Sequence, residues 1–142
     1  MPTKSMSVDI NRSPSEVFDF LADAENDARW RPSVIEVRRV EGSGVGARYH
    51  QMLRGPGGRS VAADIVVDEL RPPSRIGFHT VSGPVRPTGH YDIAPAGTGS
   101  TVTLTLEAQL SGIKRLMSSM VEKSMASEVD ALTALKQVLE RR

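Results

Sequence analysis

The fold is decided by residues 100–139, whose sequence is STVTLTLEAQLSGIKRLMSSMVEKSMASEVDALTALKQVL. Residues 100–110 alternate between apolar and polar side chains, which predicts a strand with one buried and one wet face. From Ile113 to Leu139 apolar side chains recur at helical spacing, which predicts a helix about 40 Å long at about 1.5 Å per residue. We expect no strand after this helix, so it cannot be a crossover between parallel strands. Its apolar stripe must therefore pack on a sheet formed earlier in the chain.

Two short helices are expected after the first strand. Ser13 is a suitable N-cap, Pro14 fits the first helical position, and Glu16 can reach back to the cap. This pattern predicts a helix over residues 14–22. A second short helix is expected over residues 24–30, where a proline follows and stops it.

Glycine and proline clusters separate segments that alternate with period two. Residues 55–58, Gly-Pro-Gly-Gly, are a strong hairpin signal because glycine adopts a positive φ at little steric cost. Short turns between successive strands predict a meander. The expected strands cover residues 3–11, 34–40, 47–54, 61–70, 75–81, 86–93 and 100–110. The sequence thus predicts an α+β fold, with a curved antiparallel sheet of six to seven strands around a long C-terminal helix.

The composition excludes several classes of function. The 142 residues are enough for one domain, expected over 1–142, and 39 % are hydrophobic and 25 % charged. A net charge of +1 gives no electrostatic reason to expect binding to nucleic acid or to a membrane surface. The chain has no cysteine, which excludes disulfides, thiol catalysis and zinc-thiolate sites. We expect a cytoplasmic protein without membrane insertion, because no apolar leader or continuous apolar run of about 18 residues occurs.

Four segments carry a resemblance that extends over the chain: SPSEVFDFLADAENDARWRPSVIEVRRVEG at 13–42, GVGARYHQML at 44–53, VDELRPPSRIGFHT at 67–80 and PAGTGSTVTLTLEAQLSG at 95–112. With the closing helix, they resemble the polyketide cyclase/dehydrase-like branch of the START-related (SRPBCC) superfamily. The resemblance implies a helix-grip fold, in which the sheet grips the C-terminal helix around an apolar cavity. It does not imply one activity, because that family includes lipid and hormone carriers, aromatase/cyclases, coenzyme Q-binding helpers and co-chaperone-like proteins.

A space between sheet and helix is the expected binding site. We expect its ligand to be small and mostly apolar, such as a lipid, an isoprenoid or an aromatic polyketide-like molecule. Methionines of the last helix would give it adaptable walls, although they could equally be plain core. The candidate ligand-binding residues are Trp30, Tyr49, Gln51, Phe78, Tyr91, Met117, Met120, Ser124 and Glu128.

Two interpretations of Glu128 remain open, because this carboxylate falls inside the apolar stripe of the last helix. It meets a polar group of the ligand or an arginine of the sheet, or else the stripe drifts toward Met125 and Val129 and leaves it in water. Trp30 also has two interpretations, as a cap on the ligand or as an anchor of the helical hairpin. Its neighbour Arg31 is expected in solvent.

Histidine is the side chain best suited to acid/base work near neutral pH. His79 and His90 are expected to point away from the cavity, because their apolar neighbours point inward. Alternation leaves open whether His50 or its neighbour Gln51 faces the cavity. Because the three histidines are not expected to converge, the sequence predicts no metal site, and no cofactor is expected. No inward pair of carboxylates is expected either, since the strand aspartates fall on the outward parity: Asp64, Asp68 and Asp92.

The sequence favours ligand binding, because no catalytic constellation stands out and the catalytic residues are unknown. The alternative is a polyketide cyclase/dehydrase-type enzyme that positions a ligand in the same cavity. In that case Tyr49, Tyr91, Glu128 or a histidine would move protons. A third possibility is an interaction module that uses the sheet edge or the exposed helix face as a homodimer.

Overall fold

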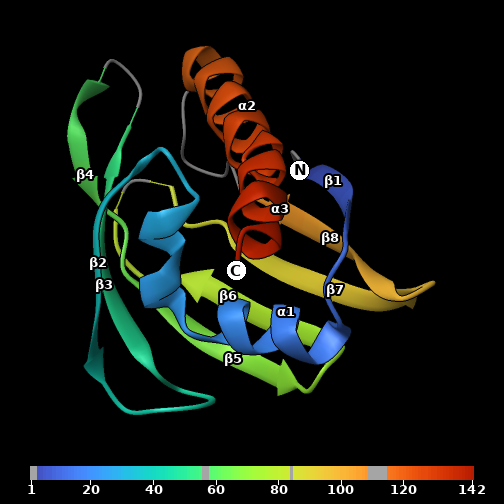
Figure 1. Cartoon of the computed structure of the whole chain (residues 1–142). Coiled ribbons are helices and arrows are strands. Elements are labelled where there is room, and N and C mark those ends of the chain that lie inside the picture. Colours follow the sequence, from blue (N-terminus) through green and yellow to red (C-terminus); the bar gives the residue numbers. More distant parts are fainter. Residues whose placement is uncertain (1–2, 56–57, 84, 109–114) are drawn as a thin grey trace.

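The computed structural model describes residues 3–55, 58–83, 85–108 and 115–142, with only the backbone for 115–118. Figure 1 shows a strongly curved sheet whose concave side faces the C-terminal helices and two short N-terminal helices. The elements in chain order are β1 (Thr3–Ile10), α1 (Pro14–Ala22), the 3₁₀ helix η1 (Ala24–Arg29), β2 (Val34–Glu41), β3 (Arg48–Arg54), β4 (Ser60–Ala62), β5 (Ile65–Arg71), β6 (Arg75–Thr80), β7 (Thr88–Ala96), β8 (Gly99–Glu107), α2 (Arg115–Asp130) and α3 (Leu132–Glu140).

The sheet is antiparallel and open, with the strand order β1-β8-β7-β6-β5-β3-β2 and with β4 paired to β3. The predicted meander is confirmed from β2 to β8. The first strand, β1, does not lie beside β2 but joins the far edge next to β8. The predicted α+β class and curved antiparallel sheet are confirmed.

Two expected elements are divided in the structure. The strand expected over 61–70 breaks into β4 and β5 at Asp64, whose N–H is bound by the Ser82 hydroxyl and whose carboxylate accepts from β3. The expected C-terminal helix bends between α2 and α3 at Ala131. There the Ala131 N–H is shared between the carbonyls of Ser127 and Glu128, a tightening that interrupts the regular ladder. Expectations for residues 109–114 lie outside the described residues.

The start of α1 forms as its sequence predicts. The Ser13 hydroxyl accepts from the Glu16 N–H at 3.3 Å, and Pro14 occupies the first turn. The buried face of α1 consists of Val17, Phe18, Phe20 and Leu21. This face packs across one end of the sheet, against β6, β7 and β8.

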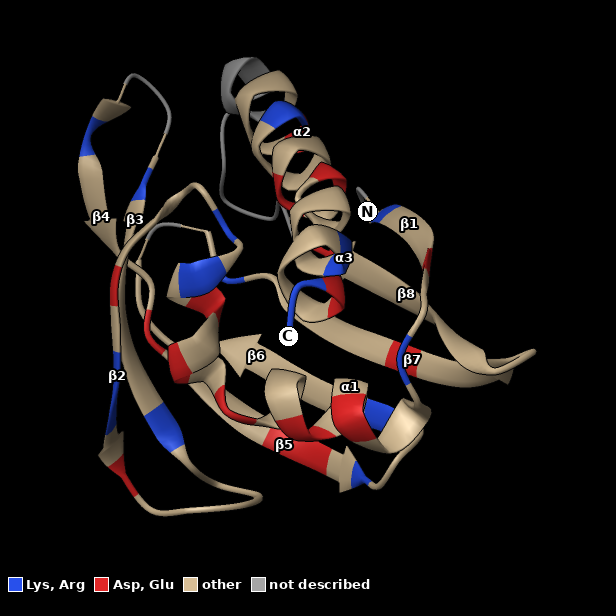
Figure 2. Ribbon diagram, viewed as in Figure 1, with Lys and Arg blue, Asp and Glu red and all other residues tan. Residues whose placement is uncertain are grey.

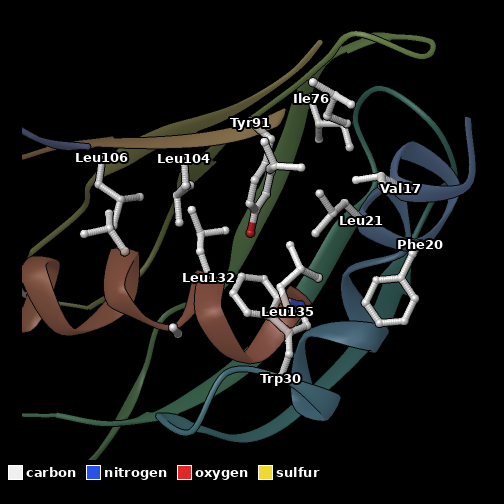
Figure 3. Close-up of a cluster of buried hydrophobic side chains, with 14 of the residues drawn as sticks. Val17, Phe20, Leu21, Trp30, Ile76, Tyr91, Leu104, Leu106, Leu132 and Leu135 are labelled. Carbon is white, nitrogen blue, oxygen red and sulfur yellow. The ribbon is translucent and has the colours of Figure 1, made fainter. Parts of the chain in front are cut away.

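The main core lies between β8 and α3. Val102, Leu104 and Leu106 point inward from β8, as the alternation predicts, and meet a stripe on α3 that includes Leu132 and Leu135 (Figure 3). Burial of each such side chain contributes about 1.5–3 kcal/mol. The core thus fills the space beneath α3 and α1.

Charges of both signs are interspersed along strands and helices in the view of Figure 2. Among the described residues, no helix combines the length and the apolar character that a membrane span requires.

Candidate functional site

A cavity of about 500 Å³ lies between the concave face of the sheet, η1 and α2. Most of its wall is apolar and comes from four strands and one helix: Ile65 and Val67 of β5, Ile76 and Phe78 of β6, Tyr91 of β7, Leu104 and Leu106 of β8, and Val121 and Met125 of α2. Arg54, Arg59, Met120 and Ser124 line the cavity and are also exposed, so they lie at its mouth.

The η1 helix brings polar side chains to the inner wall. Asp23 caps it by accepting from the Glu25 N–H at 3.0 Å, and the Asn26 amide donates to the Phe20 carbonyl of α1 at 2.9 Å. These two bonds orient η1 so that Asp27 is buried and lines the cavity.

Arg31, just after η1, holds together a buried polar group that we call the Arg31 cluster: Asp27, Arg31, Ser33, Gln51 and Glu128. Its Nη1 donates to Asp27 Oδ2 at 3.0 Å and to Gln51 Oε1 at 2.9 Å. Its Nε donates to Glu128 Oε2 at 2.9 Å, and Nη2 lies 2.7 Å from the same oxygen. The Ser33 hydroxyl donates to the other oxygen of Glu128. The cluster therefore joins η1, β3 and α2 around one guanidinium.

Burial and mutual charge shift the titration of this cluster. Burial raises the pKa of Asp27 to about 6, against the opposing effect of the Arg31 charge. Burial alone would lower the pKa of Arg31, but the carboxylates of Glu128 and Asp27 outweigh it and raise that pKa. The cluster thus places two carboxyl groups around one guanidinium.

Tyr91 lies between the apolar wall and the Arg31 cluster. Burial, followed by the charge of Asp27, raises the pKa of its hydroxyl well above the usual range. Its ring packs edge-on against Trp30, with centroids 6.4 Å apart, and lies 5.9 Å from the Phe78 ring. Figure 3 shows Tyr91 extending from the sheet with its hydroxyl toward the helix side of the molecule. The site can therefore offer a neutral phenol next to a charged network.

The structure places six of the nine candidate binding residues on the cavity wall: Gln51, Phe78, Tyr91, Met120, Ser124 and Glu128. Trp30 is buried in the main core, and Tyr49 packs with Ala24 and Ala47 in a second core cluster; neither is among the lining residues. The side chain of Met117 lies outside the described residues. Ligand contact by these residues remains a prediction.

The expectation that Arg31 lies in solvent is wrong. Arg31 is drawn inside because Asp27 and Glu128 compensate its charge. Glu128 does meet an arginine at the cavity, although this arginine comes from the segment after η1 and not from the sheet. Met125 and Val129 are buried as well, so the apolar stripe of the helix also shifts toward these two residues, as the second interpretation of Glu128 states. The strand aspartates Asp64, Asp68 and Asp92 lie beside the outward histidines, as expected, and the carboxyl groups at the cavity come from other elements, since Asp27 and Glu128 share Arg31.

Sequence reasoning missed Asp27. The available signal was an acidic residue on a predicted helix four positions before an arginine that directly follows the helix, because residues at this spacing can pair. That spacing alone does not tell whether the face is buried.

The histidines lie on the convex side of the sheet, each beside an aspartate. His79 and His90 point outward, as predicted, with Nδ1 of His79 at 3.0 Å from Asp68 and Nε2 of His90 at 3.4 Å from Asp92. His50 also points away from the cavity, because Gln51 occupies the inward position, and its Nδ1 lies 3.0 Å from Asp64. Within the described ranges no three His, Asp or Glu side chains gather as a metal site.

Comparisons with known proteins agree with this architecture. A family model described as "Polyketide cyclase / dehydrase and lipid transport" matches residues 1–140. A search of curated proteins found no match.

Three solved structures illustrate the shared fold. A START superfamily protein from Mycobacterium smegmatis is 17 % identical, with a TM-score of 0.80 over 98 % of this chain and 97 % of that one. The protein TTHA0849 from Thermus thermophilus is 21 % identical, with a TM-score of 0.78 over 99 % of this chain and 98 % of that one. The di-domain ARO/CYC BexL from the BE-7585A biosynthetic pathway is 21 % identical, with a TM-score of 0.73 over 99 % of this chain and 50 % of that one. At these identities the likeness establishes the fold alone.

Proposed function

The chain belongs to the polyketide cyclase/dehydrase and lipid transport family, and from this premise we propose that it binds a small, mostly apolar molecule between the sheet and α2. The observation that carries the proposal is the cavity of about 500 Å³, whose wall is mostly apolar, with the Arg31 cluster at its inner end and Arg54, Arg59 and Ser124 at its mouth. Ligand sites commonly combine such an apolar wall with a few polar groups that orient the guest. The guest classes that suit this wall are lipids, isoprenoids and aromatic polyketide-like molecules.

The shape of the wall supports a carrier role. Val121 and Met125 supply adaptable apolar surface from α2, and Phe78 and Tyr91 supply flat aromatic surface from the sheet. Met120 and Ser124 lie where the guest would enter.

Native mass spectrometry of the protein purified from its own host tests the proposal directly. We expect a bound small molecule whose mass identifies its class. A matched pair of variants then locates it: Ser124→Trp fills the mouth, whereas Ser127→Trp places the same side chain at an exposed position of α2 outside the cavity. Loss of the bound species in the first variant only is the expected result. Absence of any binder across a broad panel of lipids and aromatic compounds would refute the carrier role.

An enzymatic role in the same cavity is the second candidate. The observation that favours it is a pair of titratable groups beside the apolar wall, Asp27 with a pKa of about 6 and the Tyr91 phenol. A group with a pKa near the working pH is suited to proton transfer. If the protein turns over a polyketide-like ligand, Tyr91→Phe should lower the rate by a larger factor than it lowers the affinity, as measured by product formation and by calorimetry.

A further inference from the structure

The inner end of the cavity has an unusual balance of charge for a site that takes an amphipathic guest. Its charged side chains among the described residues are Asp27, Arg31 and Glu128, two carboxylates and one guanidinium. The only other charged side chains among the described lining residues, Arg54 and Arg59, lie at the mouth in solvent. A guest that reaches the inner end therefore meets a net negative charge.

The charge of the guanidinium is already compensated within the cluster. Nε and Nη1 of Arg31 donate hydrogen bonds to Glu128, Asp27 and Gln51, and Nη2 lies 2.7 Å from Glu128 Oε2. The Gln51 amide nitrogen also donates to the carbonyl of Ala63 at 3.0 Å. A carboxylate guest would add a third negative charge beside this one guanidinium, which already compensates Asp27 and Glu128.

Two polar groups of the lining residues have unused hydrogen-bonding capacity. Tyr91 and Asp27 both line the cavity; the Tyr91 hydroxyl forms no hydrogen bond with another described residue, and Oδ1 of Asp27 accepts none from the described side chains. A hydroxyl group can use both, because it donates one hydrogen bond and accepts others. An ionised carboxylate can only accept, so it would face the Asp27 carboxylate with no proton to share.

We propose that the inner end of the cavity selects an uncharged, hydrogen-bond-donating end of the guest, an alcohol or a phenol, and rejects a carboxylate. This inference rests on the proposed binding function and names the chemistry of the guest. Its physical basis is the desolvated negative charge, which discriminates by repulsion as well as by attraction.

Isothermal titration calorimetry with 2-naphthol and 2-naphthoate tests the proposal, since the two probes share one ring system and differ in the polar group. The titrations are made at about pH 8, where a carboxyl group with a pKa near 6 is ionised. We expect the wild-type protein to bind 2-naphthol at least about tenfold more tightly than 2-naphthoate.

Two variants remove one negative charge each from the inner end, Asp27→Asn and Glu128→Gln. In at least one of them we expect the preference to fall below about threefold, through tighter binding of 2-naphthoate. Glu122→Gln is the matched control, because it removes an exposed carboxylate of α2 that does not line the cavity, and it should leave the preference unchanged.

Equal affinity for the two probes in the wild-type protein would overturn the inference. Loss of 2-naphthoate binding in Arg54→Gln/Arg59→Gln would then place that anion at the mouth. An unchanged preference in both charge-removal variants would also overturn it. Binding of neither probe would overturn the inference, whereas a bound small molecule in native mass spectrometry would leave the proposed binding function standing.

Discussion

Replacement of Arg31 by methionine tests whether the Arg31 cluster stabilises the fold as its geometry indicates. The side chains of Arg31, Asp27 and Glu128 are only 13, 7 and 15 % exposed, so their interaction belongs to the buried class. Removal of one partner of a buried ion pair costs about 3–5 kcal/mol, because the other charge is left without compensation. Arg31 compensates two such charges. We therefore expect Arg31→Met to lower the free energy of unfolding by about 4 kcal/mol at neutral pH.

Urea denaturation measures this loss, followed by circular dichroism and by the fluorescence of the only tryptophan, Trp30, which is buried. Arg38→Met is the matched control, since Arg38 pairs with Glu36 at 3.3 Å on the exposed β2 strand and should contribute less than about 1 kcal/mol. If Arg31→Met costs no more than Arg38→Met, the reasoning about the buried cluster is wrong.

Three further changes probe the cavity and the core. The pKa of Asp27 is raised from 3.8 to about 6 in the folded protein, so its contribution to stability is full below about pH 4 and is lost as the pH rises through 6. The free energy of unfolding of Asp27→Asn should therefore rise by about 3 kcal/mol relative to that of the wild type as the pH is raised from about 4 to 7. A difference between the two proteins that does not change with pH would contradict this. Leu132→Ala should cost about 2–5 kcal/mol in urea titrations, because Leu132 is fully buried, and a loss below about 1 kcal/mol would mean that the site collapses around it. In Gly89→Ala the new Cβ would lie 2.5 Å from Phe78 Cζ and 2.7 Å from Leu106 Cδ2. Because both side chains must shift, we expect the free energy of unfolding to fall by about 1–3 kcal/mol and the probes to bind more weakly. An unchanged melting temperature and unchanged affinity would show that both side chains move aside freely.

The elements that the sequence predicts correctly are those determined by residues close together in the chain. The alternation around Val102 and Leu104 marks the buried face of β8 without reference to any partner. Ser13 and Pro14 likewise define the start of α1 through bonds within one turn. Such patterns survive in the folded protein because packing reinforces them.

The parts that could not be predicted depend on distant partners. Arg31 and Glu128 are 97 positions apart, and nothing near either residue indicates that they meet. The bend at Ala131 could not be predicted either, because alanine is the best helix former and gives no local signal for an interruption. The orientation of His50 was undecided because both faces of its strand carry polar and apolar side chains.

The bend at Ala131 separates two tasks along one stretch of backbone. Leu132, Leu135 and Leu139 fix α3 in the interior, whereas α2 carries the exposed Met120 and Ser124 at the entrance. Displacement of the Met120 end of α2 would open the entrance while Leu132, Leu135 and Leu139 stay in the core. A guest can thus enter or leave at that end while Glu128, further along the same helix, stays joined to Arg31.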